Sequence, residues 1–243
     1  MSSSWHVVPQ WKDVFTSLAK AVDCDGELIN ESLMSRLVLA ETNGTRFYIK
    51  TYASRGRWLR RFVGRSRIRA EWENVQAFER LGVPTARLVG FGEQVTDQGY
   101  RGVMITEEVR DTRDLAALVS EGHPAMDDRK WRLAVIRRLS GAVRRLHEAG
   151  FVHNDLKWRN ILVELGEDPA VYLIDCPQGL LLRGPLLRRG LAKDLACLDK
   201  IGRTALSRAD RLRFYLLTRG MATLNESAKR EIRRVLSFFS GRR

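Results

Sequence analysis

Three side chains suited to phosphoryl transfer occur within the octet that runs from residue 153 to residue 160. Asp155, Lys157 and Asn160 supply a carboxylate, an ammonium group and an amide, in that order. Phosphoryl transfer requires a base near the acceptor hydroxyl, a cation near the transferred phosphate and oxygen ligands for magnesium. Short apolar segments flank the octet on both sides. We therefore expect a polar loop that buried strands hold rigidly at both ends, which suits a catalytic role.

The octet reads H-x-D-x-K-x-x-N and resembles the catalytic loop of the protein-kinase-like superfamily, which usually reads H-R-D-x-x-x-x-N. The resemblance implies that Asp155 orients and deprotonates the acceptor hydroxyl, and that Lys157 stabilises charge on the transferred phosphoryl group. It makes His153 a structural hydrogen-bonding residue rather than the base. Asn154 replaces the usual Arg, which ordinarily binds a phosphorylated activation loop. This replacement argues against such control and fits small-molecule and sugar kinases.

A second acidic position follows the octet at a suitable distance. Residues 171–174 form a short apolar segment that predicts a strand, and Asp175 comes directly after it, fifteen residues after Asn160. The superfamily places its magnesium-binding D-F-G aspartate here, so the resemblance implies that Asn160 and Asp175 hold Mg²⁺ against the phosphates of ATP. The next residues are Cys176 and Pro177 instead of Phe-Gly. Because Pro177 restricts the backbone, we expect one fixed active geometry.

Lys50 is expected on a strand upstream of these residues. Residues 46–52 alternate between apolar and polar side chains after the hairpin signal Asn43-Gly44. The segment resembles the V-A-I-K strand of the superfamily. That resemblance implies that Lys50 contacts the α and β phosphates of ATP and pairs with a glutamate from a helix.

The helical pattern from about residue 68 to residue 81 offers two such glutamates. Glu71 shares a helix face with apolar residues further along, so it should point inward. Glu73 lies well round the helix from Glu71 and is ranked second. Glu71 is therefore the expected partner of Lys50.

Other segments complete the expected order of elements. Residues 102–106 predict a buried strand that leads into a hinge, where the backbone of Glu107 and Val109 would meet the adenine of ATP. A helix is predicted from about residue 127 to residue 149, ending at Gly150. Asp194 resembles the later-helix aspartate that braces the catalytic loop, although a simple N-cap is an equally good interpretation.

Two parts of the superfamily pattern are missing. No G-x-G-x-x-G motif precedes Lys50, and the corresponding stretch runs from Asn30 to Arg36. Backbone N–H groups, two serine hydroxyls or Arg36 could cover phosphates there. An A-P-E-like end to the activation segment is also missing. Only eighteen residues separate Asp175 from Asp194, too few for the usual docking platform for protein substrates.

Length and composition fit an α+β, bilobal protein-kinase-like fold. The 243 residues are 44% hydrophobic, enough to bury a substantial core. We expect a strand-rich lobe over residues 1–106, led by a short helix from about Trp11 to Val22, and a helical lobe over residues 107–243. Three cysteines without C-x-x-C spacing indicate neither a disulfide framework nor a zinc site, which favours the reducing cytoplasm. We also expect neither a signal peptide nor a membrane-spanning helix.

Charge suggests an anionic partner. The formal net charge is +13, and the run Arg55–Arg69 holds seven arginines and no acid. Apolar residues recur at helical spacing within it, as in basic helices that lie on anionic membranes. The alternative is that these apolar residues pack on the lobe and the arginines are merely solvated. Further basic residues lie in the C-terminal helix and after Asp175, namely Arg183, Arg188, Arg189 and Lys193.

Taken together, these segments resemble the bacterial lipopolysaccharide core kinases that phosphorylate heptose or Kdo sugars. The resemblance rests on the Lys50 strand with the basic insert after it, the helix that carries Glu71, residues 105–108, the catalytic loop and Asp175. It implies ATP- and Mg²⁺-dependent transfer to a sugar hydroxyl, heptose by preference, on lipid A-core at the cytoplasmic face of the inner membrane. Such an anionic, membrane-borne acceptor gives the Arg55–Arg69 run, expected on the membrane surface, a physical purpose. The resemblance also implies an acidic partner, acyl carrier protein.

Two rival interpretations stay open. A compact protein kinase is compatible with the octet, but Asn154 and the short segment after Asp175 count against it. A non-catalytic nucleic-acid-binding protein is suggested by the isoelectric point of about 10.3 alone. That interpretation gives no purpose to Lys50 or Asp155, so nucleic acid is not an expected partner.

Overall fold

The computed structural model describes residues 2–54, 65–96 and 99–240. The chain divides into two compact units, one of Met1–Gln76 with Ala86–Arg110 and one of Ala77–Thr85 with Asp111–Arg243. This division differs in two places from the boundary expected between residues 106 and 107. Phe78 and Val83 belong to the core of the second unit, whereas the Glu108 N–H donates to the Arg46 carbonyl within the first.

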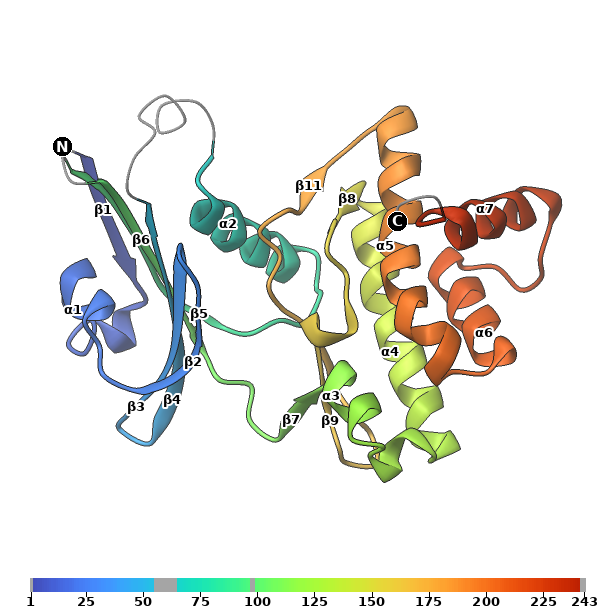
Figure 1. Cartoon of the computed structure of the whole chain (residues 1–243), viewed down its shortest axis with the longest axis horizontal. Helices are drawn as coiled ribbons and strands as arrows, with labels where there is room; N and C mark the ends of the chain where they lie inside the picture. Colours follow the sequence, from blue (N-terminus) through green and yellow to red (C-terminus); the bar gives the residue numbers. More distant parts are fainter. Residues whose placement is uncertain (1, 55–64, 97–98, 241–243) are drawn as a thin grey trace. The chain divides into compact units, whose positions relative to one another are not determined.

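The first unit is built on a six-stranded antiparallel sheet in the order β1-β5-β6-β4-β3-β2 (Figure 1). Its strands are β1 (Ser2–Val7), β2 (Glu27–Glu31), β3 (Ser35–Thr42), β4 (Thr45–Ser54), β5 (Leu88–Thr96) and β6 (Gly99–Glu107). One face buries a cluster centred on Phe47, Ile49 and Ile105. The sheet therefore gives β4 a rigid setting with neighbours on both sides.

The hairpin that precedes Lys50 has the predicted form. Asn43 and Gly44 both have positive φ, 53° and 71°, as a type I′ turn requires. The turn sets the register of β3 and β4, in which Lys50 lies opposite Leu37. The strand prediction for Lys50 is confirmed.

The expected helix from Trp11 to Val22 is wrong for most of its length. Residues Ser2–Val7 form the edge strand β1, Pro9–Trp11 form a short 3-10 helix (η1), and only Leu18–Val22 form a helix, α1. Trp11 and Phe15 pack edge-on against Phe47, with ring centroids 4.7 and 5.3 Å apart. These two aromatic residues therefore pack on the sheet and do not form one face of a helix.

Helix α2 (Arg67–Arg80) agrees with the predicted range, and Gly82 follows it at φ 65°. The Ser66 hydroxyl accepts the Arg69 N–H at 3.1 Å at its beginning. The membrane-binding helix predicted within Arg55–Arg69 lies mostly outside the described residues, which omit 55–64. At the described end of the run, Arg65 pairs with Glu73 at 2.8 Å and Arg69 pairs with Glu93.

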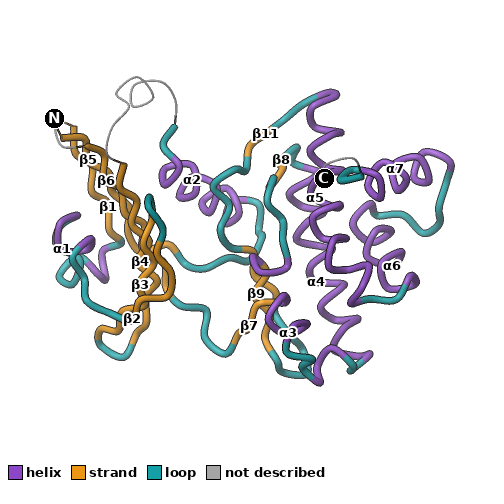
Figure 2. Tube along the Cα trace, viewed as in Figure 1, coloured by secondary structure: helices purple, strands orange, loops and turns teal. Residues whose placement is uncertain are grey.

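The second unit is mainly helical and carries two small sheets (Figure 2). Its strands are β7 (Thr112–Asp114), β8 (Phe151–Val152), β9 (Ile161–Glu164), β10 (Val171–Leu173) and β11 (Leu180–Leu181). Its helices are α3 (Leu115–Ser120), α4 (Arg129–Glu148), α5 (Gly184–Ala205), α6 (Arg208–Arg219), α7 (Glu226–Ser237) and the 3-10 turns η3 (Pro124–Met126) and η4 (Trp158–Asn160). Within the described ranges, no helix has the length and apolar character needed to cross a lipid bilayer.

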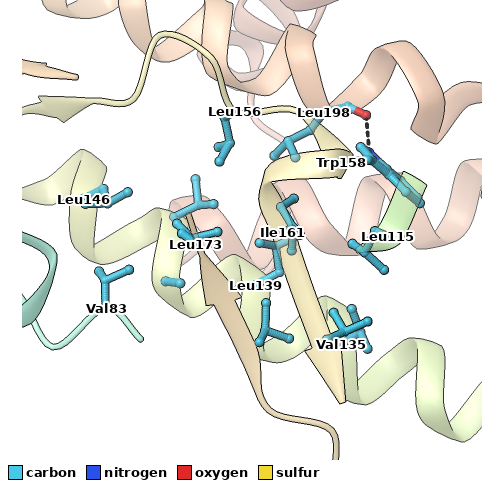
Figure 3. Close-up of a cluster of buried hydrophobic side chains, with 14 of the residues drawn as sticks. Val83, Leu115, Val135, Leu139, Leu146, Leu156, Trp158, Ile161, Leu173 and Leu198 are labelled. Atoms are coloured by element: carbon cyan, nitrogen blue, oxygen red, sulfur yellow. Dashed lines mark hydrogen bonds between the residues drawn. The ribbon is translucent and has the colours of Figure 1, made fainter. Parts of the chain in front are cut away.

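Helix α4 matches the helix predicted before the catalytic loop. The Asp128 carboxylate caps its first turn by accepting the Lys130 N–H at 2.8 Å, and Gly150 follows its end at φ 74°. Its apolar face packs into the core shown in Figure 3, where Val135, Leu139 and Leu146 lie near residues of β9 and β10. This core supports the polar loop between β8 and β9.

Candidate active site

The loop from His153 to Asn160 is held from below by two of its own apolar side chains. Leu156 and Trp158 are buried in the core of the second unit. The Trp158 indole N–H donates to the Leu198 carbonyl of α5 at 2.7 Å, which is the dashed line in Figure 3. Because alternate residues point into the core, Asp155 and Lys157 are directed away from it.

Asp194 holds the backbone at the start of this loop. It lies in the middle of α5 and is fully buried. Its Oδ2 accepts the His153 N–H and its Oδ1 accepts the Asn154 N–H, each at 2.8 Å. The N-cap interpretation is therefore wrong, and the geometry matches the bracing interpretation.

Asn154 occupies a left-handed conformation, with φ 65°, which Asn tolerates better than most residues. Its amide group donates to the Gln178 carbonyl at 3.1 Å and accepts from the Lys193 ammonium at 3.2 Å. Asn154 thus connects the catalytic loop with the segment after Asp175 and with α5.

Asp155 and Lys157 form an ion pair. The Lys157 Nζ lies 2.6 Å from the Asp155 Oδ1. The Asp155 side chain is mostly buried, whereas that of Lys157 is 45% exposed. The carboxylate is therefore held in place, while the ammonium group has room to move toward an incoming phosphate.

Asn160 and Asp175 carry side-chain oxygen atoms at adjacent positions, where a cation could be held. The Asn160 Nδ2 donates to the Asp155 carbonyl at 2.9 Å, which leaves the amide Oδ1 as the atom available to a cation. The Ile174 N–H donates to the Asn160 carbonyl at 3.0 Å, so Asp175 follows directly beside Asn160. One amide oxygen and one carboxylate fit Mg²⁺, which usually takes its remaining ligands from phosphate and water. Asp175 has φ 55°, a strained conformation that is common at functional sites.

His153 differs from the expectation that it forms structural hydrogen bonds through its side chain. Within the described part of the chain, neither ring nitrogen has a hydrogen-bond partner. The fully buried ring packs against Phe78, with centroids 5.8 Å apart. Burial lowers the pKa of His153, against the opposing effect of Asp194, Asp155 and Asp175. The residue braces the loop by packing and through its backbone N–H.

In the first unit, Lys50 and Glu71 form the expected pair. The Lys50 Nζ lies 2.8 Å from Oε1 and 2.9 Å from Oε2 of Glu71. The Glu71 side chain is 3% exposed and that of Lys50 is 18% exposed. Glu73, which was ranked second, instead pairs with Arg65 at the surface. The ammonium group is therefore held at a fixed position on β4.

The residues expected to form a hinge, Glu107 and Val109, and the stretch before Lys50 also lie in the first unit. Strand β6 extends through Glu107, whose N–H donates to the Arg87 carbonyl at 2.9 Å, and Val109 follows in irregular backbone. The hydroxyls of Ser32 and Ser35 lie 2.9 Å apart and close the turn between β2 and β3. The N–H groups of Met34 and Ser35 donate to the Ser32 hydroxyl at 3.4 and 3.1 Å, and the Ser32 N–H donates to the Ser35 carbonyl at 2.8 Å, so these groups bond within the turn.

Sequence reasoning missed the role of Lys193 beside Asn154. The sequence placed Lys193 among general basic residues, because only the fold brings α5 against the catalytic loop. The adjacent residues Lys193 and Asp194 carried part of the signal, since neighbouring residues of a helix can contact the side chain and the backbone of one loop residue. The left-handed backbone at Asn154 and Asp175 had no sequence signal beyond the residue types.

Comparison with solved structures identifies the fold. The structure of WaaP in complex with acyl carrier protein matches with a TM-score of 0.76 and 20% identity, over 98% of this chain and 97% of that chain. The α+β, protein-kinase-like fold class expected from the sequence is confirmed.

Two relatives with assigned functions are kinases of lipopolysaccharide sugars. A 3-deoxy-D-manno-octulosonic acid kinase of Actinobacillus succinogenes is 32% identical over 108 residues, or 44% of this chain and 42% of that protein. The lipopolysaccharide core heptose(I) kinase WaaP of Escherichia coli strain K12 is 25% identical over 201 residues, or 76% of this chain and 72% of that protein. The match thus spans less than half of the first kinase and nearly three quarters of the second.

A family model extends over most of the site. The model for the lipopolysaccharide kinase (Kdo/WaaP) family matches residues 25–216, a range that includes Lys50, Glu71, the catalytic loop and Asp175. Because this match covers more than half of the sequence, the chain belongs to the lipopolysaccharide kinase (Kdo/WaaP) family.

Proposed function

We propose that this protein is an ATP- and Mg²⁺-dependent kinase that phosphorylates a heptose hydroxyl of the lipopolysaccharide inner core. The observation that carries the proposal is the braced catalytic loop, in which Asp194 fixes the backbone next to Asp155. Membership of a lipopolysaccharide kinase family supports the acceptor class. The choice of heptose over Kdo rests on the greater extent of the match to the heptose(I) kinase.

Asp155 is the proposed base. Its carboxylate would accept a hydrogen bond from the sugar hydroxyl and take the proton as the oxygen attacks the terminal phosphate of ATP. Lys157 pairs with Asp155 at 2.6 Å. We propose that the Lys157 ammonium group turns to the transferred phosphoryl group and leaves the Asp155 carboxylate available to the acceptor.

Asn160 and Asp175 are the proposed magnesium ligands, and Lys50 is the proposed contact of the α and β phosphates. Bound Mg²⁺ would neutralise charge on the nucleotide phosphates. The carboxylate of Glu71 orients the Lys50 ammonium group. The backbone of Glu107 and Val109 is assigned to the adenine.

The acceptor would be lipid A-core lipopolysaccharide, which is anionic and membrane-borne. A net charge of +13 favours such an acceptor and peripheral association with the cytoplasmic face of the inner membrane. The same charge suits acyl carrier protein, an acidic protein, as a further partner. The solved WaaP structure that matches this fold is a complex of WaaP with that protein, which supports the choice of partner.

Phosphate transfer from labelled ATP tests the proposal directly. Purified full-length protein would be incubated with core lipopolysaccharide, with Kdo-terminated acceptor lacking heptose, and with total cellular protein. Label should enter the heptose-containing acceptor, and the core oligosaccharide should gain the mass of one phosphate. If label enters only the Kdo acceptor, the acceptor is Kdo and not heptose. If label enters only protein, the result favours a protein kinase.

Two variants tie this activity to the site. Asp155→Ala and Asp175→Ala should each abolish transfer, because one lacks the base and the other lacks a magnesium ligand. Asp168→Ala is the matched control, since that carboxylate lies 81% exposed in the loop between β9 and β10. Near-normal turnover by a folded Asp155→Ala protein would remove Asp155 from the mechanism. If Mg²⁺-ATP gives no thermal shift while nucleic acid does, the kinase proposal fails.

A further inference from the structure

An exposed surface at the beginning of α5 combines leucines with unneutralised arginines. From Cys176 to Lys193 the chain has four cations, six leucines and no acid. Leu181 and Leu186 are 69% and 65% exposed, and Leu180 is 41% exposed. Arg183, Arg188 and Arg189 are also exposed, and no described carboxylate forms an ion pair with them. We call these six residues the β11–α5 surface.

This surface is fixed to the strand that enters the catalytic loop. Leu180 and Leu181 of β11 pair with Val152 and Phe151 of β8, and the adjoining Leu182 N–H donates to the Gly150 carbonyl at 2.9 Å (Figure 1). Helix α5 also packs closely on β8. A Cβ atom at Gly190 would lie only 2.6 Å from a Val152 methyl group, so glycine is required for this approach. The exposed leucines are therefore mounted on an ordered framework.

Large exposed apolar side chains that lie among unpaired cations in one short segment indicate a binding surface. We propose that the β11–α5 surface docks on an anionic lipid bilayer. Leu181 and Leu186 enter the boundary between headgroups and acyl chains, and the three arginines contact lipid phosphates. Charge complementarity carries this assignment, because the segment from residue 176 to residue 193 contains no acid that would repel the membrane.

A lipid surface fits the residue types better than a protein partner. Energetically dominant residues of protein interfaces are enriched in Trp and Tyr as well as Arg. Leu is under-represented among those residues, whereas six leucines occur between Cys176 and Lys193. Leucines interspersed with arginines are typical of segments that lie at the membrane interface.

Docking here would orient the catalytic loop toward the bilayer. This orientation rests on the proposed function. A kinase with a membrane-borne acceptor must meet the acceptor sugars where they emerge from the bilayer. Leu180 of this surface pairs with Val152 of β8, and Val152 lies two residues before Asn154 in the sequence. The surface would thus raise the local concentration of acceptor without contributing to phosphoryl transfer itself.

Vesicle binding tests the inference without any kinase assay. Full-length protein would be sedimented with vesicles of phosphatidylglycerol and phosphatidylcholine, and with vesicles of phosphatidylcholine alone. Arg188→Gln/Arg189→Gln should weaken binding to the anionic vesicles by about fivefold per charge. Leu181→Ser/Leu186→Ser should weaken it by about tenfold for each fully inserted leucine. Added salt should weaken the arginine contribution more than the leucine contribution.

Two matched substitutions lie elsewhere on the second unit. Leu165→Ser removes an exposed leucine from the loop after β9, and Arg137→Gln removes an exposed arginine from α4. Both should bind vesicles as the unmodified protein does. Unfolding curves would verify that all four variants are folded. Unchanged vesicle binding by both double variants would overturn the inference. It would also be overturned if the double variants kept vesicle binding but lost binding to an acidic protein.

Activity on two acceptors separates this inference from the proposed function. The leucine variant should phosphorylate a deacylated, water-soluble core oligosaccharide at the normal rate and the vesicle-borne acceptor more slowly. If the unmodified protein phosphorylates neither acceptor, the proposed function fails while the vesicle result stands. Equal rates of the leucine variant and the unmodified protein on vesicle-borne acceptor would remove the link between the surface and acceptor delivery.

Discussion

The buried carboxylate of Asp194 accepts the backbone N–H of Asn154 at 2.8 Å, immediately before the proposed base Asp155. Its other oxygen accepts the N–H of His153 at the same distance. One side chain from α5 therefore fixes two consecutive peptide groups of the catalytic loop. Both oxygens are needed, because each N–H is bonded to a different one.

Asp194→Asn should destabilise the protein and slow transfer together. The new amide keeps one oxygen but places an NH₂ group against the second backbone N–H, so one buried hydrogen bond is lost. The free energy of unfolding should fall by about 2 kcal/mol or more, as for buried bonds to a charged group. Urea unfolding and kcat measured on the same preparation would test this. Asp168→Asn removes only a surface pair with Arg138, so it should cost less than about 1 kcal/mol and leave kcat unchanged.

The side chain of Asn154 provides a second prediction. Asn154→Gly keeps the left-handed backbone but loses the bonds to Gln178 and Lys193, at a cost of about 1–2 kcal/mol. Asn154→Ala should cost about 1 kcal/mol more, because alanine disfavours φ 65°. Asn154→Arg should be at least as harmful, since arginine offers Lys193 no acceptor and repels it.

Kinetics distinguish a positioning role for Asn154 from a purely structural one. If Asn154 positions the loop, kcat should fall by up to about a hundredfold in Asn154→Gly while the KM for ATP changes little. Circular dichroism and unfolding curves would be recorded on the same variants. A stability loss with unchanged kcat would assign Asn154 to folding alone.

The sequence predicted the segments whose local signals and tertiary roles agree. The Asn43-Gly44 turn, the strand of Lys50 and the helix that ends at Gly150 all combine a turn or cap residue with clear periodicity. The prediction of a helix from Trp11 to Val22 was mostly wrong, because Trp11 and Phe15 pack on Phe47 from a non-helical backbone. β1 was missed, since its serine-rich sequence lacks the alternation of a strand and forms one only by pairing with β5.

The proposed catalytic residues were easier to predict than their supports. Asp155, Lys157 and Asn160 are close in sequence, so their types and spacing are visible together. The contacts of Lys193 and Asp194 with the loop span 39 to 41 residues and depend on how α5 packs against β8. His153 shows the same limit, because its surroundings rather than its type leave the ring without a hydrogen-bonding partner among the described residues.

The helix α2 allows a matched comparison of two glutamates. Glu71→Gln should reduce kcat/KM by about a hundredfold, because Lys50 loses the carboxylate that orients it toward the phosphates. Glu73→Gln, two positions along the same helix, removes only a surface pair with Arg65 and should cost less than about 1 kcal/mol. The Mg²⁺-ATP thermal shift should shrink in the first variant and persist in the second. Equal activity of the two variants would contradict the role of Lys50.

Burial of His153 predicts a particular dependence of stability on pH. Burial lowers the pKa of the imidazole in the folded protein below its ordinary value of 6.5. Above pH 6.5 the ring is neutral in both states, and the contribution to stability has its full value. As pH falls below 6.5 the unfolded chain binds a proton that the folded chain does not, so the free energy of unfolding decreases. The loss ends once the pH is below the folded-state pKa.

Urea unfolding at a series of pH values tests this assignment. His153→Leu removes the titrating ring from its apolar site beside Phe78, so its free energy of unfolding should fall less steeply below pH 6.5. Phe78→Leu is the matched control, because it disturbs the packing against the same ring without removing a titrating group. That variant should be less stable by about 1 kcal/mol or more at every pH, with the slope of the unmodified protein. If His153→Leu keeps the full slope, another group is responsible for the loss of stability in acid.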